Sequence, residues 1–140
     1  MKRNLIGILP LLVISMALNV TANAQALAKA NVPFAFRVGS ASLPAGTYKI
    51  DRAGDGAISI RNSDVTAGAM STVQHDSSGN TGYKLVFHCV GGEYFLAEIW
   101  RGSGNSGLVL PRSKQETKLE KELLASGQRN TSEQILIATY

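Results

Sequence analysis

The chain has a single cysteine, Cys89, among its 140 residues, so it cannot form an internal disulfide. This excludes the small disulfide-rich scaffolds and leaves the burial of apolar side chains as the source of stability. Charged residues are also scarce, at 17%, and 14 basic against 10 acidic side chains give a net charge of only +4. So small and scattered a charge does not predict a nucleic-acid partner. The 44% of hydrophobic residues is typical of a compact globular protein with one domain.

The N-terminal segment is organised like a secretory signal peptide. A basic start at Lys2-Arg3 precedes an apolar stretch of 14 residues at 5–18, and small residues follow at Ala22-Asn23-Ala24, where a signal peptidase would cleave. The apolar stretch is shorter than the roughly 20 residues that a membrane-spanning helix needs. The sequence therefore predicts a signal peptide at 1–24, a single β domain at 25–140 with no membrane span after cleavage, and a periplasmic or extracellular location.

Short segments with alternating apolar and polar residues recur along the rest of the chain, each bounded by turn-forming residues. The segment 32–38 alternates in this way and ends at Gly39, and the segments 48–51 and 58–61 flank a loop at Gly54-Asp55-Gly56. Such a pattern is typical of antiparallel sheets. It predicts an all-β fold, an antiparallel sandwich or small barrel of about eight strands with one C-terminal α-helix.

The strongest strand pair is predicted in YKLVFHCVGGEYFLAEIWR, residues 83–101, where two apolar runs flank Gly91-Gly92. Two glycines accept the positive φ angles of a tight hairpin turn. A turn centred there pairs residues whose numbers sum to 183. In that register Leu85 lies opposite Glu98 on one face of the hairpin, and His88 lies opposite Phe95 on the other.

The hydrophobic period changes after residue 110. Ser113 and Glu116 form a capping-box pattern, in which the serine caps the helix and the glutamate reaches back to the serine amide. The pattern predicts a helix at 113–126 that ends at Gly127, with an apolar stripe of leucines packed against the sheet. The final apolar run, 134–140, is rich in β-branched residues and predicts a last strand.

Four residues of the predicted hairpin are candidates for ligand binding: His88, Glu98, Trp100 and Arg101. Glu98 is predicted among apolar side chains, where a carboxylate must be paired or protonated. No residue is assigned a catalytic role. No cofactor or metal is predicted either, because the chain has two histidines and one cysteine, and His88 and Cys89 point to opposite faces of one strand. The match of Gly102–Gly107 to G-x-G-x-x-G precedes no helix and is interpreted as a loop.

Three segments carry a resemblance to known proteins: VPFAFRVGSASLPAGTYKI at 32–50, KLVFHCVGGEYFLAEIW at 84–100 and LPRSKQETKLEKEL at 110–123. Together they resemble a group of small exported bacterial proteins with no assigned activity, which carry the patterns PFxFxVG, LPAGxY, KLVFHxxGxxYFLxxIW and LPxSKxE. The resemblance implies the same exported β domain and no catalytic residues. The clearest departure is Cys89-Val90 after His88, where the pattern has a basic or aromatic residue.

These observations favour a non-enzymatic binding or structural module of the cell envelope or the medium, with an unknown protein or small molecule as partner. One alternative is a lipocalin-like carrier, whose apolar cavity would be lined by Phe34, Phe36, Phe87 and Trp100. A second alternative is a hydrolase that uses His88 and Glu98, which would have to converge on one cleft.

Overall fold

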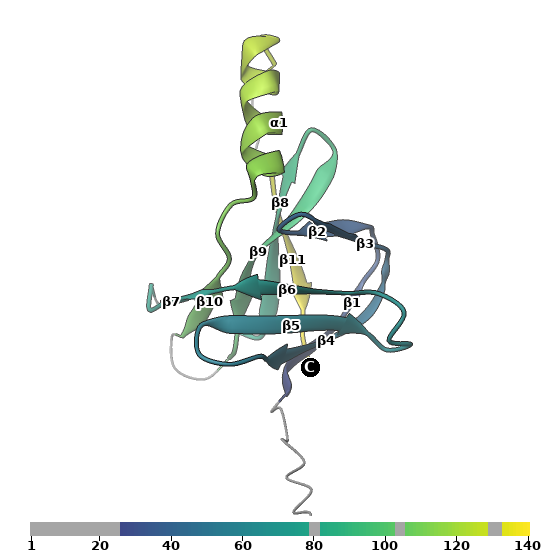
Figure 1. Cartoon of the computed structure of the whole chain (residues 1–140). Coiled ribbons are helices and arrows are strands. Elements are labelled where there is room, and N and C mark those ends of the chain that lie inside the picture. Colours follow the sequence, from purple (N-terminus) through teal and green to yellow (C-terminus); the bar gives the residue numbers. More distant parts are fainter. Residues whose placement is uncertain (1–25, 79–81, 103–105, 129–132) are drawn as a thin grey trace, which may run out of the picture.

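The structure is a computed structural model that describes residues 26–78, 82–102, 106–128 and 133–140. The signal peptide predicted at 1–24 lies outside these residues, as does the centre of the glycine-rich loop at 103–105. The described residues form eleven strands and one helix (Figure 1). The elements are β1 (Ala26–Val32), β2 (Phe36–Val38), β3 (Ala41–Leu43), β4 (Gly46–Arg52), β5 (Ala57–Asn62), β6 (Gly68–Thr72), β7 (Gln74–Asp76), β8 (Lys84–Val90), β9 (Glu93–Trp100), β10 (Gly107–Val109), α1 (Lys114–Ala125) and β11 (Glu133–Ala138).

The strands form two sheets whose directions cross in Figure 1. The first sheet has the order β1-β4-β5-β6, with antiparallel neighbours throughout. The second has the order β11-β8-β9-β10-β7, and the short hairpin β2-β3 joins it through a parallel contact between β2 and β9. The all-β sandwich with a C-terminal helix is therefore confirmed, although several strands of three residues raise the count above the predicted eight.

The two sheets are connected along both flanks. On one side Lys29 and Tyr140 exchange main-chain hydrogen bonds of 3.1 and 2.9 Å, so the chain after β11 pairs with β1. On the other side only Val73 separates β6 from β7, so one continuous segment pairs with β5 in the first sheet and with β10 in the second. Strands that bend from one sheet into the other form the corners of crossed sandwiches.

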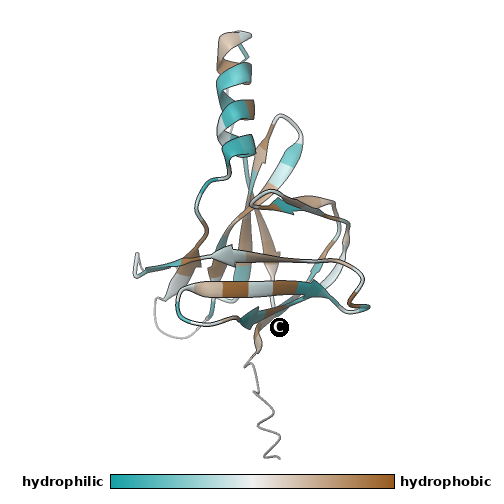
Figure 2. Cartoon of the chain, viewed as in Figure 1, coloured by the Kyte–Doolittle hydropathy of each residue, from teal (hydrophilic) through white to brown (hydrophobic). Residues whose placement is uncertain are grey.

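The core lies between the sheets and is built from every second side chain of the long strands. Figure 2 shows this alternation of hydrophobic and hydrophilic residues along β5. Aromatic rings meet edge to face at its centre: Phe36 lies 5.0 Å from Tyr48 and 5.3 Å from Phe87, measured between ring centroids. The buried Tyr48 hydroxyl donates a hydrogen bond of 2.7 Å to the Pro44 carbonyl. Its burial raises the pKa of Tyr48.

The predicted strand at 32–38 is wrong, because the structure divides it between two sheets. β1 ends at Val32, and β2 begins at Phe36. Pro33 lies in the gap, and proline has no amide proton to donate to a strand ladder. The chain therefore leaves the first sheet at this proline and enters the second, where Phe36 points into the core.

The predicted hairpin turn is confirmed, but the register is correct only near the turn. Gly91 and Gly92 have φ angles of 59° and 82°, and His88 pairs with Phe95 as expected. Farther from the turn, the register shifts by one residue between Val86 and Phe87, so Glu98 pairs with Val86 instead of Leu85. The extra residue on β9 is Ala97. A bulge of this kind exchanges the faces of all residues beyond it.

The helix lies where it was predicted, but its packing differs. Ser113 Oγ accepts the Glu116 amide proton at 3.0 Å, and Gly127 follows the helix with a φ of 76°. The leucine stripe was expected against the sheet. Leu119 is half-buried beside Gly91 of the β8-β9 turn, as expected, but Leu124 is 59% exposed, and Glu116 is the buried residue of the helix. Figure 1 shows the reason, since α1 projects beyond the end of the sheets. No helix among the described residues is long and apolar enough to cross a membrane.

Candidate functional site

His88 connects the second sheet to the helix. Its Nδ1 lies 3.0 Å from Oε1 of Glu116, and the two side chains are 15% and 5% exposed. The capping-box prediction assigned the Glu116 carboxylate to the Ser113 amide, whereas in the structure it contacts His88, 28 residues away. Pairing satisfies a carboxylate that would otherwise be buried at high cost. His88 therefore helps to hold the first turn of α1 against β8.

The other candidates from the hairpin also have partners within the fold or are buried. Glu98 Oε2 accepts a hydrogen bond of 2.6 Å from Trp100 Nε1. Trp100 is 1% exposed, and Gly107, which lies opposite it on β10, leaves the space that its ring occupies. Arg101 is partly buried, and its Nε has no hydrogen-bond partner among the described residues. A side chain as buried as Trp100 presents no surface to a ligand.

The bulge in β9 changes the relation between His88 and Glu98. Because Glu98 pairs with Val86, two residues from His88, both side chains are on the same face of the second sheet. Each contacts a different partner, however, Glu116 for His88 and Trp100 for Glu98. The cavities described below are lined by other side chains. Among the described residues, therefore, neither side chain lines one of these cavities, and the two are held by different partners.

The aromatic residues expected around a carrier cavity are separated in the structure. Phe34 and Phe36 each pack against Phe87, with ring centroids 5.2 and 5.3 Å from it. Trp100 lies on the opposite face of β9, because it is paired with Lys84 while Phe87 is paired with Leu96. Phe36 and Phe87 are buried, so their rings occupy part of the space between the sheets.

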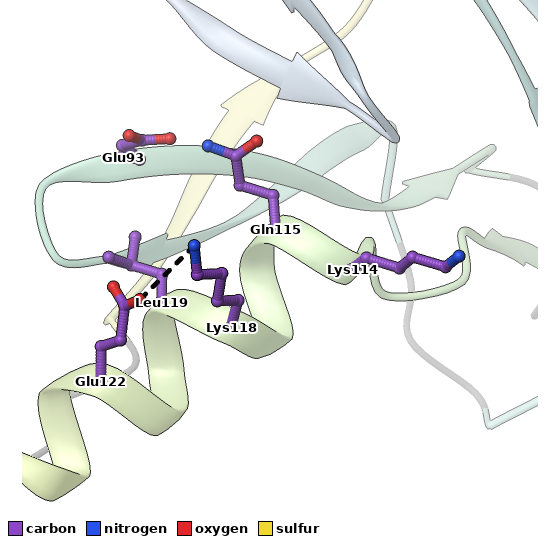
Figure 3. A pocket seen from close by; sticks show the side chains of 6 residues that line it. All are labelled: Glu93, Lys114, Gln115, Lys118, Leu119 and Glu122. Atoms are coloured by element: carbon purple, nitrogen blue, oxygen red, sulfur yellow. Dashed lines mark ion pairs between the residues drawn. The ribbon is translucent and has the colours of Figure 1, made fainter.

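A first surface cavity, of about 330 Å³, lies between α1 and the β8-β9 hairpin. Figure 3 shows Leu119 and Lys118 pointing from the helix toward the hairpin, with Glu122 paired to Lys118. Glu93, at the other wall, is paired with Arg37 at 2.6 Å. Charges of both signs line this cavity, and Glu93, Lys118 and Glu122 are each in an ion pair, so the cavity has no strong preference for a charged ligand.

A second cavity, of about 530 Å³, lies on the outer face of the first sheet and is predominantly cationic. Lys29, Lys49 and Arg61 line it from three neighbouring strands, and Lys49 is directly opposite Lys29 on one side and Arg61 on the other. We call these three residues the cation row. Like charges directly opposite each other on neighbouring strands destabilise a sheet. The row therefore has an energetic cost that a bound anion would offset.

A buried carboxylate lies beneath the cation row. Asp51 is 2% exposed, and its Oδ1 lies 3.1 Å from Lys49 Nζ while its Oδ2 lies 3.6 Å from Arg61 Nη2. The first contact is an ion pair without the alignment of a hydrogen bond, since Oδ1 has no hydrogen-bond partner among the described residues. Lys49 and Arg61 remain half exposed above it, at 52% and 53%. Asp51 compensates one of the three charges and holds two cations in place.

The rim of the cationic cavity is a structured turn after β5. The Asn62 side-chain oxygen accepts the amide protons of Thr66 and Ala67 at 2.8 and 3.1 Å, and Ser63 Oγ donates to the Thr47 carbonyl at 3.3 Å. Val65, 71% exposed, has a φ of 56°. A β-branched residue in this region is strained, and such strain is held only where surrounding contacts determine the backbone.

Sequence reasoning did not identify the cation row. The signal that was present is the hairpin 48–61, because a turn centred on Asp55 places Lys49 opposite Arg61, as the structure does. No local signal places Lys29 in the row, since the β2-β3 hairpin separates β1 from β4 along the chain. The pairing of β1 with β4 depends on the tertiary fold.

Neither protein-family models, curated proteins nor solved structures yield a match to this chain. The geometry and charge of its own surface therefore carry the functional inference.

Proposed function

We propose that this protein is an exported, non-enzymatic binding module of the cell envelope or the medium, and that it binds an anionic ligand at the cation row. The observation that carries the proposal is the alignment of Lys29, Lys49 and Arg61 across three strands, above a cavity of about 530 Å³. Three side-chain cations against the one carboxylate of Asp51 leave an excess positive charge there. Concave surfaces of one sign concentrate ligands of the opposite sign.

A binding role is favoured over a hydrolytic one by where the acids and bases lie. Asp51, the carboxylate of the cationic cavity, is 2% exposed and paired with Lys49 and Arg61. His88 and Glu98 have Glu116 and Trp100 as partners. General acid or base catalysis requires a group within hydrogen-bond reach of the reacting atom. The exposed groups of the cavity are instead cations, which bind and orient anions.

Export is proposed from the basic, apolar and small-residue pattern at 1–24. Its test is the intact mass of the protein recovered from the periplasm or the medium of a producing bacterium. We expect a mass that corresponds to a chain starting at Gln25. A mass that retains Met1, or recovery from the cytoplasm alone, would contradict the proposed location.

Binding is tested with inorganic polyphosphate as a simple polyanion, by calorimetric titration at low salt. The double variant Lys49→Gln/Arg61→Gln removes two charges from the cation row. The control variant Lys114→Gln/Lys121→Gln removes the same charge from α1. At about 1 kcal/mol for each cation that contacts an anionic surface, we expect the first variant to bind roughly thirtyfold more weakly. Both control lysines line another cavity, of about 340 Å³, together with Arg112 and Lys118, so equal losses in both variants would contradict a preference for the cation row.

A further inference from the structure

The cation row is longer than a single anionic group. Its three residues are directly opposite one another on β1, β4 and β5. Neighbouring strands are about 4.8 Å apart, so the row extends over about 10 Å perpendicular to the strands. The oxygens of one carboxylate or phosphate are bonded to a single atom and reach at most two neighbouring cations. A ligand that contacts all three therefore carries at least two anionic groups.

Contacts with neighbouring side chains restrict the positions of all three cations. Lys49 and Arg61 share the buried carboxylate of Asp51, at 3.1 and 3.6 Å. Lys29 Nζ lies 5.6 Å from the centre of the Tyr140 ring, a cation–π contact. Side chains held in this way lose little further conformational entropy when they bind. The spacing of the positive charges is consequently set by the sheet, and it favours a ligand with anionic groups at a matching, regular spacing.

The side chains around the row discriminate between polyanions. Among the described residues that line the cavity none is aromatic, and the single ring beside it, Tyr140, faces Lys29, whereas single-stranded nucleic acids are bound largely by stacking of successive bases on several aromatic rings. An extended acidic peptide presents side chains on one face only every two residues, about 6.7 Å, which exceeds the strand spacing. A 1,4-linked pyranose unit spans about one strand spacing between its two glycosidic oxygens, so in a ribbon whose units alternate in orientation the carboxylates on one face recur at about two strand spacings. Ser63 adds a hydroxyl that can bond to sugar hydroxyls.

We propose that the ligand is a linear acidic polysaccharide, with one carboxylate on each sugar unit, that lies along the cation row across β1, β4 and β5. This inference rests on the proposed function and specifies its ligand class. Carboxylates two units apart would pair with Lys29 and Arg61, Lys49 would contact the unit between them, and the sugar hydroxyls would face the polar rim at Ser63. Arg61 can bind a carboxylate through two parallel N–H groups.

The experiment compares four probes by calorimetric titration with the exported protein: an oligogalacturonate of six units, galacturonic acid itself, inorganic polyphosphate and single-stranded DNA. We expect the oligogalacturonate to bind at least about a hundredfold more tightly than the monomer. Once one carboxylate is bound, the linked carboxylates bind intramolecularly, at a high effective concentration. Each removal of a row cation should reduce the slope of log K against log salt concentration by about one.

The variants separate the site from the stability of the fold. Lys49→Gln tests the centre of the row, and Lys29→Gln tests its end without disturbing the pair between Asp51 and Arg61. Lys121→Gln on α1 is the control, and the thermal unfolding of each variant confirms that it is folded. We expect weaker oligogalacturonate binding in both row variants and none of this loss in the control.

The other outcomes are distinguishable. Binding of polyphosphate or DNA that depends on Lys49, without binding of oligogalacturonate, would overturn the polysaccharide and leave the proposed anion-binding function standing. Galacturonic acid that binds as tightly as the oligomer would overturn the linear ligand. If no probe binds, or if both row variants bind like the unmodified chain, the proposed function fails together with the inference.

Discussion

Single side chains in this protein acquire their roles from the specific partners that the fold gives them. His88 and Glu116 form a largely buried pair between β8 and α1, and Glu98 accepts the indole proton of Trp100. These contacts use the groups that would otherwise be the strongest candidates for catalysis. The exposed cations of the first sheet have the opposite character, because the three cations of the row share a single carboxylate, Asp51, which contacts Lys49 and Arg61. The paired groups therefore stabilise the fold, whereas the exposed cations remain accessible to a ligand.

The pair between sheet and helix is tested by Glu116→Gln. The variant leaves His88, which is 15% exposed, without its charged partner. Loss of a buried polar contact costs about 1 to 3 kcal/mol, and we expect the free energy of unfolding in urea to fall by that amount. The matched control is Glu122→Gln. Glu122 is farther along the same helix, and its ion pair with Lys118 is exposed. A control that is as destabilised as Glu116→Gln would refute the special role of the pair.

Tyr48 makes stability depend on alkaline pH. Burial raises its pKa above the ordinary value of 10.0, so the folded state keeps the hydroxyl proton when the unfolded state has lost it. The contribution to stability is complete below pH 10.0 and is lost as the pH rises toward the folded-state pKa. We expect urea midpoints to decline from pH 9 to 11 less steeply in Tyr48→Phe. Tyr140→Phe, at an exposed position, should retain the full decline.

At the level of secondary structure, one inserted residue in β9 has the largest consequence. The bulge at Ala97 lets Leu96 and Ile99 both face the core, and it moves Trp100 to the other face of the second sheet. There Trp100 lies over Gly107 on β10. The helix, by contrast, is defined by its own caps and contacts the sheet only through its first turns.

The close approach of β9 and β10 is tested by Gly107→Ala. A Cβ atom at Gly107 would lie 2.7 Å from Trp100 Cζ3, so the buried ring has to move. Overpacking of this kind costs about 1 to 3 kcal/mol, which thermal unfolding would report. Gly46→Ala in β4 is the same substitution where the nearest atom, on Tyr48, is 3.7 Å away. Equal stability of the two variants would contradict the described packing.

The complete domain is held together where its two sheets meet. The chain end after β11 pairs with β1 through Lys29 and Tyr140, and the segment β6–β7 passes from one sheet to the other. The first of these junctions also fixes one end of the cation row, since the Tyr140 ring lies beside the Lys29 ammonium group. Stability and the proposed binding surface therefore share a contact.

Removal of Tyr140 tests this junction. A chain that ends at Thr139 loses both main-chain hydrogen bonds with Lys29, of 3.1 and 2.9 Å. At about 0.5 to 1.5 kcal/mol for each bond, we expect urea unfolding to show a loss of about 1 to 3 kcal/mol. Tyr140→Ala keeps the main chain and removes the ring, so it should be more stable than the truncated chain. The reverse order of stability would mean that the ring, and not the backbone pairing, joins the sheets.

The strands, the central turn and the helix cap could be predicted because each is determined by residues that are close together in the chain. Alternation defined the strands, Gly91 and Gly92 supplied the φ angles of the hairpin turn, and Ser113 capped the helix. The four proposed ligand-binding residues came from the same local reasoning. The face of the sheet on which Glu98 and Trp100 lie follows from a bulge that no local pattern reveals, and the partner of His88 is Glu116, 28 residues away.

Turn chemistry and hydrophobic period thus determined the all-β character, the central hairpin and the C-terminal helix, because both act over a few consecutive residues. Strand order was decided by the packing of two sheets around a shared core, which is a property of the collected side chains. The cation row was likewise decided by the tertiary structure. It exists because β1 pairs with β4 across an intervening hairpin, and this brings Lys29 beside Lys49.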